Sequence, residues 1–117
     1  MLNVMISRDA IAKEYVNVIN NYYPVAGKLL DRCLIRVLEL TADRTKHRSY
    51  YLCIYYLEEY GDRILEHQDV FRDAAENMGL IEVVFVSIDR LVKDPLSKIK
   101  QEDFRFWLEL CWLVNNQ

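Results

Sequence analysis

The chain is poor in the residues that build tight turns. Among its 117 residues there are only three glycines and two prolines. A sandwich or barrel of short strands needs many tight turns, which are usually made with glycine and proline. Their scarcity favours long helices with few connections, and a chain of this length corresponds to one ordinary domain.

Helical periodicity extends over most of the chain, because apolar residues recur at the i, i+3, i+4 and i+7 spacing of one helix face. The expected helices are a first one capped by Ser7 and ended by Pro24, a second at 25–40, a third from Thr41 or Asp43 to Gly61, a fourth from Asp62 to Gly79, and a last at about 101–115. Within the third, residues 50–60 are apolar around the whole helical wheel, which is typical of a buried helix. The sequence therefore predicts an all-α fold, a single compact bundle of five to six helices spanning residues 1–117.

The segment at 80–93 is ambiguous. Its apolar residues have helical spacing, but its valines and isoleucines are typical of a strand. We expect a helix, because intrinsic propensity is a weak guide against packing. The alternative is an α+β fold in which residues 2–6 pair with residues 81–86 as two short strands.

Composition narrows the class of function. The net charge of −3 and the isoelectric point near 5.4 argue against a general nucleic-acid binder. Cys33, Cys53 and Cys111 are widely spaced and form no CxxC pair, so we expect free thiols in a helical core, which fit a reducing compartment. The N-terminal apolar run is too short for a signal peptide, and no stretch is long enough for a membrane helix. These features predict a cytoplasmic protein without a membrane partner.

Catalytic and metal-binding motifs are missing from the sequence. Neither His47 nor His67 has a glutamate three residues before it, as a helical di-iron site requires. There is no Gly-x-Ser-x-Gly elbow and no glycine-rich phosphate loop. We therefore expect no metal, no cofactor and no catalytic residue. An enzyme whose acid–base groups, such as Glu58 or Glu59, meet only in the folded chain stays open as an alternative.

One basic cluster departs from the usual pattern of helix charges. It stands at the expected start of the third helix, where the helix dipole favours negative charge. Together with a neighbouring tyrosine it is a possible surface for an anionic partner, either an acidic protein or a nucleic acid. The cluster consists of Arg44, Lys46, His47, Arg48 and Tyr51. The simpler interpretation is that Glu39, Asp43 or a neighbouring helix neutralises it.

A regular acidic stripe follows on the fourth expected helix. Such a stripe is most often a solvated face, and the alternative is a docking face for a basic partner. Its members are Asp62, Glu66, Asp69, Asp73 and Glu76.

Apolar surface exceeds what a bundle of this size can bury, because the third expected helix, the one at 80–93 and the last one are apolar on more than one face. On the last helix, Phe106, Leu110 and Leu113 are the expected oligomer interface. The sequence therefore predicts a small non-enzymatic protein–protein interaction module, an adaptor, inhibitor or complex subunit, that self-associates through apolar helix faces as a homodimer. The alternative is a nucleic-acid-associated protein that uses residues 44–51.

Overall fold

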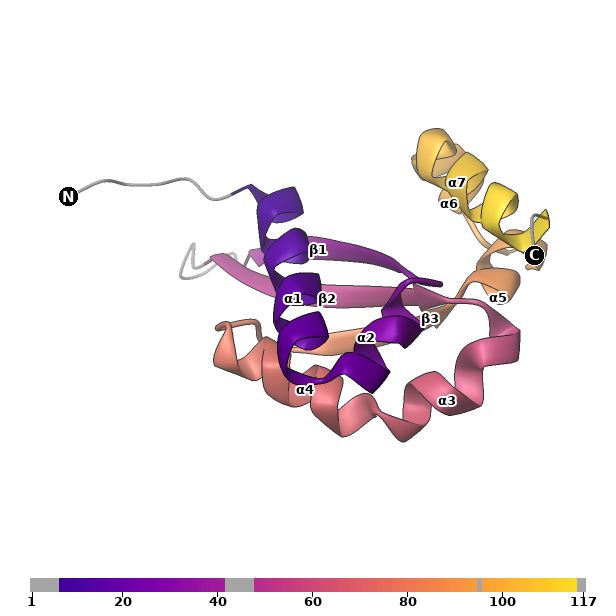
Figure 1. Cartoon of the computed structure of the whole chain (residues 1–117). Helices are drawn as coiled ribbons and strands as arrows, with labels where there is room; N and C mark the ends of the chain where they lie inside the picture. The colour runs from indigo at the N-terminus through magenta and orange to yellow at the C-terminus, as the bar shows by residue number, and fades with distance from the viewer. Residues whose placement is uncertain (1–6, 42–47, 95, 116–117) are drawn as a thin grey trace.

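The computed structural model describes residues 7–41, 48–94 and 96–115, which form a three-stranded sheet with helices on both faces (Figure 1). The expectation of an all-α bundle is therefore wrong, and the fold is α+β. In chain order the described elements are α1 (Arg8–Tyr22), α2 (Pro24–Leu30), β1 (Leu34–Thr41), β2 (Arg48–Tyr56), η1 (Glu58–Tyr60), α3 (Gly61–Glu66), α4 (Gln68–Asn77), β3 (Val83–Ser87), α5 (Ile88–Lys93), α6 (Ile99–Glu102) and α7 (Phe104–Asn115).

The sheet is mixed, and its strand order is β1-β2-β3. β1 and β2 are antiparallel, with Leu34 opposite Tyr55 and Thr41 opposite Arg48. β3 runs parallel to β2, with Leu52 opposite Val83. A parallel pair needs a crossover connection, and α3 and α4 supply it. β2 is thus the central strand, with a neighbour on each side.

Two long segments that we expected to be helical form strands, and the reason is the same for both. Of the predicted third helix, residues 48–56 form β2, and the second half of the predicted helix at 25–40 belongs to β1. Residues 52–55 of β2 are all buried, because helices cover both faces of the sheet. A strand buried on both faces is apolar at every position, so its pattern does not differ from that of a helix that is apolar all round.

The segment at 80–93 contains a strand and a short helix. β3 occupies its middle, and α5 follows directly. The strand alternative was therefore nearer to the structure than the predicted helix. β3 pairs with β2, and the partner that this alternative named, residues 2–6, lies outside the described residues.

Several helix boundaries agree with the prediction, although Gly61, which we expected to end a helix, begins α3. The Ser7 Oγ accepts the N–H of Ala10 at 3.1 Å, which confirms the N-cap of α1. Pro24 opens α2, and Gly79, with φ of 82°, follows α4 in the left-handed conformation that glycine adopts easily. The predicted fourth helix is in fact two helices, α3 and α4, which meet at His67.

Two apolar clusters lie on opposite faces of the sheet. On the first face, helices α1 to α4 cover Val37, Leu52 and Ile54. Tyr15 of α1 is buried there, and its hydroxyl donates to the Phe71 carbonyl at 2.8 Å. On the second face, α5 and α7 cover residues of β2. Figure 1 shows α5, α6 and α7 beside the end of the sheet where β2 and β3 finish.

Candidate interaction surface

The inner side of α7 packs on the second face of the sheet. Phe106 and Leu110, one helical turn apart, are buried in the cluster that also contains Cys53 and Tyr55 of β2. The Tyr55 and Phe106 rings meet edge to face, with their centroids 4.8 Å apart. Apolar contacts of this kind hold α7 in a fixed position against the sheet.

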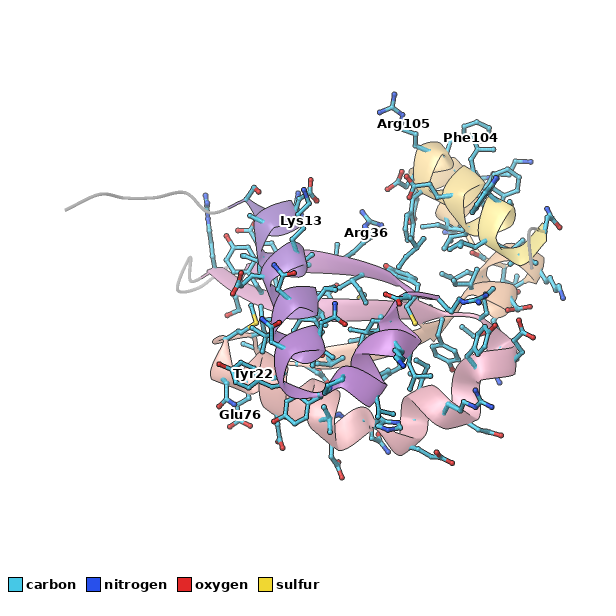
Figure 2. All side chains as sticks on the ribbon, in the orientation of Figure 1. Lys13, Tyr22, Arg36, Glu76, Phe104 and Arg105 are labelled. Atoms are coloured by element: carbon cyan, nitrogen blue, oxygen red, sulfur yellow. The ribbon has the colours of Figure 1, made fainter. Side chains whose placement is uncertain are left out.

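A carboxylate adds a polar anchor at the start of α7. Asp103 directly precedes the helix, and its Oδ1 accepts the N–H of Phe106 at 3.2 Å, as an N-cap does. The other oxygen lies 3.4 Å from Nη2 of Arg36 on β1. The Arg36 guanidinium also lies 4.3 Å from the centroid of the Phe106 ring. Figure 2 shows Arg36 projecting from the sheet toward the side on which α7 lies.

The Tyr55 hydroxyl and the Cys53 thiol beneath α7 are held uncharged. The pKa of Tyr55 is raised to about 12, mainly by burial and also by Cys53, while Arg36 acts to lower it. Burial also raises the pKa of the Cys53 thiol, against the opposing effects of Tyr55 and Arg36. A buried thiol with a raised pKa holds little thiolate at neutral pH, which makes Cys53 a weak nucleophile in this position.

The outer side of α7 carries an exposed apolar stripe. Phe104, Leu108 and Trp112, at i, i+4 and i+8, are 54%, 47% and 64% exposed. Residues at this spacing lie on one side of a helix. The Trp107 ring beside them is partly covered, since it stacks on Phe104 at 5.7 Å and the Lys100 ammonium lies 4.7 Å from it. Figure 2 shows Phe104 and Arg105 pointing away from the sheet.

The residues expected to form the oligomer interface lie mainly inside the chain. Phe106 is 6% exposed, Leu110 is fully buried, and Leu113 is half-buried. As the structure places them, Phe106 and Leu110 are already covered by the sheet and are not available to a second copy. The exposed apolar residues of α7 are on the opposite side of the helix.

We expected the oligomer interface on the side of α7 that carries Phe106, Leu110 and Leu113. This side packs mainly on the sheet, and the exposed residues Phe104, Leu108 and Trp112 lie on the other. Both sides are apolar, so hydrophobicity could not decide between them. The polar contact on the covered side, between Asp103 and Arg36 of β1, joins residues that are far apart in the sequence.

Only part of the basic segment lies among the described residues. Arg44, Lys46 and His47 lie outside the described residues, while Arg48 and Tyr51 belong to β2. The Arg48 Nε lies 3.3 Å from Oε1 of Glu39 on the neighbouring strand, so this cation has the partner that the simpler interpretation named. Tyr51 is half-buried in the second cluster.

The five acidic residues of the predicted docking face are all exposed. The break at His67 divides them between two helices. Asp62 and Glu66 lie on α3, while Asp69, Asp73 and Glu76 lie on α4. Their exposure fits a solvated face.

A polar cluster lies where the parallel strands β2 and β3 end, which is the edge where α/β sheets often bind ligands. The buried Ser87 hydroxyl donates to the Glu58 carboxylate and also accepts the N–H of Arg90 as the N-cap of α5. The Asp89 Oδ1 accepts the N–H of Glu58 at 2.9 Å. Arg90 Nε lies 3.9 Å from the Glu58 carboxylate. These groups therefore satisfy one another and join η1 to α5.

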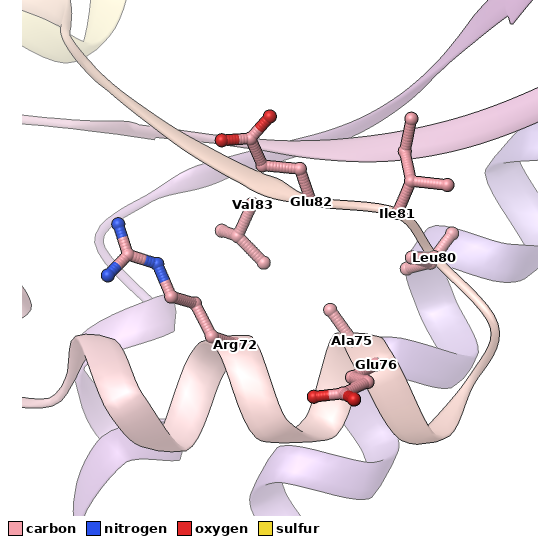
Figure 3. A pocket seen from close by; sticks show the side chains of 7 residues that line it. All are labelled: Arg72, Ala75, Glu76, Leu80, Ile81, Glu82 and Val83. Atoms are coloured by element: carbon pink, nitrogen blue, oxygen red, sulfur yellow. The ribbon is translucent and has the colours of Figure 1, made fainter.

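A pocket of about 410 Å³ lies between α4 and the chain that leads into β3 (Figure 3). Its floor is apolar, with Ala75, Leu80 and Val83, and charged groups stand around it. The Arg72 guanidinium lies 5.7 Å from the centroid of the Phe85 ring, to which it is attracted. The remaining lining residues are Glu76, Ile81 and Glu82. With acidic and basic groups mixed, the pocket shows no single ligand chemistry.

Within residues 7–41, 48–94 and 96–115, no group of three or more histidine, cysteine, aspartate or glutamate side chains could hold a metal ion. No helix in this part of the chain has the length and apolar character needed to cross a bilayer. Comparison with known proteins found no match among family models, curated sequences or solved structures.

Proposed function

We propose that the chain is a small non-enzymatic protein–protein interaction module that self-associates through the outer side of α7. The observation that supports this most strongly is the exposed stripe of Phe104, Leu108 and Trp112. One side of α7 is fixed on the sheet, so the other side is presented by a rigid element. Rigid apolar and aromatic side chains form the energetic centre of most protein interfaces, because ordering them on binding costs little entropy.

The size of the stripe supports an interface rather than incidental exposure. From ordinary side-chain areas, the three residues expose roughly 300–400 Å² of apolar surface, as much as the largest patch of a typical monomer. Exposed apolar residues elsewhere are scattered, such as Leu40 on β1 and Ile81 and Leu96 on connecting segments. Tyr22 and Val25 are also exposed near the turn between α1 and α2. Tyr22 and Val25 belong to different helices and so form no stripe along one helix, and the Tyr22 hydroxyl can be hydrated by water.

The cysteines support a proposal about the cellular compartment of this module. Cys33, Cys53 and Cys111 are free thiols. Proteins with several free thiols are more common where glutathione keeps cysteines reduced. We therefore propose the cytoplasm as the compartment in which the module assembles.

A single substitution tests the proposal. Leu108→Glu places a charge at the centre of the stripe without altering the inner side of α7. We expect the wild-type chain to assemble to a multiple of 14.0 kDa and the variant to shift toward the monomer, as measured by native mass spectrometry. Burying an unpaired carboxylate in an apolar interface costs several kcal/mol, so the loss of assembly should be at least about 100-fold in dissociation constant.

Leu96→Glu is the matched control, because Leu96 is 85% exposed and lies outside α7. It introduces the same charge in place of the same residue and should leave the mass unchanged. Circular dichroism of both variants checks that the fold is retained. Assembly that persists in Leu108→Glu, or a wild-type chain that is monomeric at all concentrations, would refute the proposed function.

A further inference from the structure

We infer that α7 docks against α7 of a second copy in antiparallel orientation, about a two-fold axis at Leu108, with Arg105 of each copy opposite Glu109 of the other. This inference rests on the proposed function and gives its partner, its geometry and its orienting residues. It follows from the spacing of the stripe and from the placement of two charges beside it.

The stripe is symmetric about its middle residue. Phe104 and Trp112 stand four residues before and after Leu108. With a rise of 1.5 Å per residue, each lies about 6 Å from Leu108 along the helix. When one of two copies is reversed about Leu108, Phe104 of each lies opposite Trp112 of the other. All three exposed side chains are then covered by the same three of the partner, as a two-fold interface requires.

The two charges lie on the same flank of the stripe. Successive residues of a helix are about 100° apart, so Arg105 is turned about 60° and Glu109 about 100° from Leu108 in the same direction. Both side chains are exposed. The spacing therefore places one cation and one anion along one border of the apolar surface.

Only the antiparallel arrangement brings these charges together. Two antiparallel helices related by a two-fold axis place the same flank of each helix side by side. Arg105 of one copy and Glu109 of the other then differ by about 3 Å in height along the helix, which their side chains can span. In a parallel pair, the flank with Arg105 and Glu109 would meet the opposite flank, where Trp107 and Cys111 lie. Charge complementarity thus fixes the orientation, as it does at other interfaces.

The expected dimer is reversible. The stripe is smaller than the roughly 800 Å² that each partner buries in a standard stable interface. The two symmetric ion pairs extend the contact on one flank, and they should make the affinity fall as salt is added. We therefore expect dissociation on dilution or in high salt.

The test uses two variants with opposite charge changes. Arg105→Glu gives a copy with two carboxylates on the flank, and Glu109→Arg gives a copy with two cations. Each alone should dimerise about ten-fold more weakly than the wild type, because attraction becomes repulsion at two symmetric pairs. When the two are mixed, every cross-pair is attractive. Native mass spectrometry separates the chains by mass, and the heterodimer should exceed the half of all dimers that random pairing gives.

Mixing the two single variants distinguishes ion pairs between copies from an ion pair within one helix. Arg105 and Glu109 are also i, i+4 neighbours, so the double variant Arg105→Glu with Glu109→Arg could recover stability within its own chain. A heterodimer of the two single variants cannot gain from that effect. Arg63→Glu and Glu66→Arg, the same substitutions on exposed residues of α3, form the matched control pair and should mix at random.

The outcomes separate this inference from the proposed function. Random mixing of the Arg105 and Glu109 variants overturns the antiparallel inference. If Leu108→Glu still disrupts assembly in that case, self-association through α7 stands with another geometry. If Leu108→Glu leaves assembly intact, the proposed function fails as well. The inference is supported if Arg105→Glu and Glu109→Arg form heterodimers preferentially while Arg63→Glu and Glu66→Arg mix at random.

Discussion

At the scale of single residues, burial decides the charge state of several titratable groups. Tyr15 is fully buried and its pKa is raised above the ordinary value by that burial. Burial raises the pKa of the Cys33 thiol to about 12, and its Sγ donates to the Leu29 carbonyl at 3.4 Å. Both groups are therefore neutral in the folded chain over a wide range of pH, although each would ionise at a lower pH in an unfolded chain.

This difference predicts how stability changes with alkaline pH. Below pH 9 the Cys33 thiol is protonated in both states, and its contribution to stability is fully present. Between pH 9 and about 12 the unfolded chain loses this proton while the folded chain keeps it, so the free energy of unfolding falls, by at most about 1.4 kcal/mol per pH unit for one group. Urea denaturation of the wild type and Cys33→Ala over this range should show a shallower decline in the variant. Parallel curves would contradict the assignment.

At the scale of elements, α7 depends on the residue before it. Asp103→Ala removes the N-cap and the partner of Arg36, and should lower the free energy of unfolding by about 1–2 kcal/mol. Asp103→Asn keeps a capping oxygen and loses only the ion pair, so it should retain most of that stability. Denaturant titration distinguishes the two, and equal losses in both variants would show that capping contributes nothing.

The elements also show what the sequence could predict. Local signals located α1 and α7, because a capping serine and a regular apolar stripe depend only on neighbouring residues. They failed for β1 and β2, because a strand forms through partners that are distant in sequence. β2 is hydrogen-bonded to residues 34–41 and 83–87, and the sequence of residues 48–56 by itself indicates neither pairing. The same limit applies to the candidate surface, since the covered side of α7 is decided by β1 and β2.

At the scale of the whole molecule, β2 is common to both apolar clusters. Leu52 and Ile54 face helices α1 to α4, while Cys53 and Tyr55 face α5 and α7. The two halves of the molecule are therefore joined through the sheet, since β1 and β3 also contribute residues to both clusters. Loss of either cluster would expose one face of the sheet.

This arrangement predicts a pattern of amide hydrogen exchange. The amides of residues 52–55 should exchange most slowly, because they open only when the sheet separates. Amides of α7 should exchange sooner, since this helix contacts the rest of the chain mainly on one side. A map measured by nuclear magnetic resonance in which α7 outlasts β2 would contradict this order of local stability.

The position of α7 has a consequence for synthesis on the ribosome. All three strands precede Phe106 and Leu110 in the chain, so the sheet can pair before the helix that covers its second face has emerged. During that interval the nascent chain exposes Cys53 and Tyr55 to the cell. Such surfaces are recognised by chaperones and promote aggregation. Translation that pauses before residue 106 would prolong the exposure, and the completed α7 ends it by covering one apolar surface while presenting another.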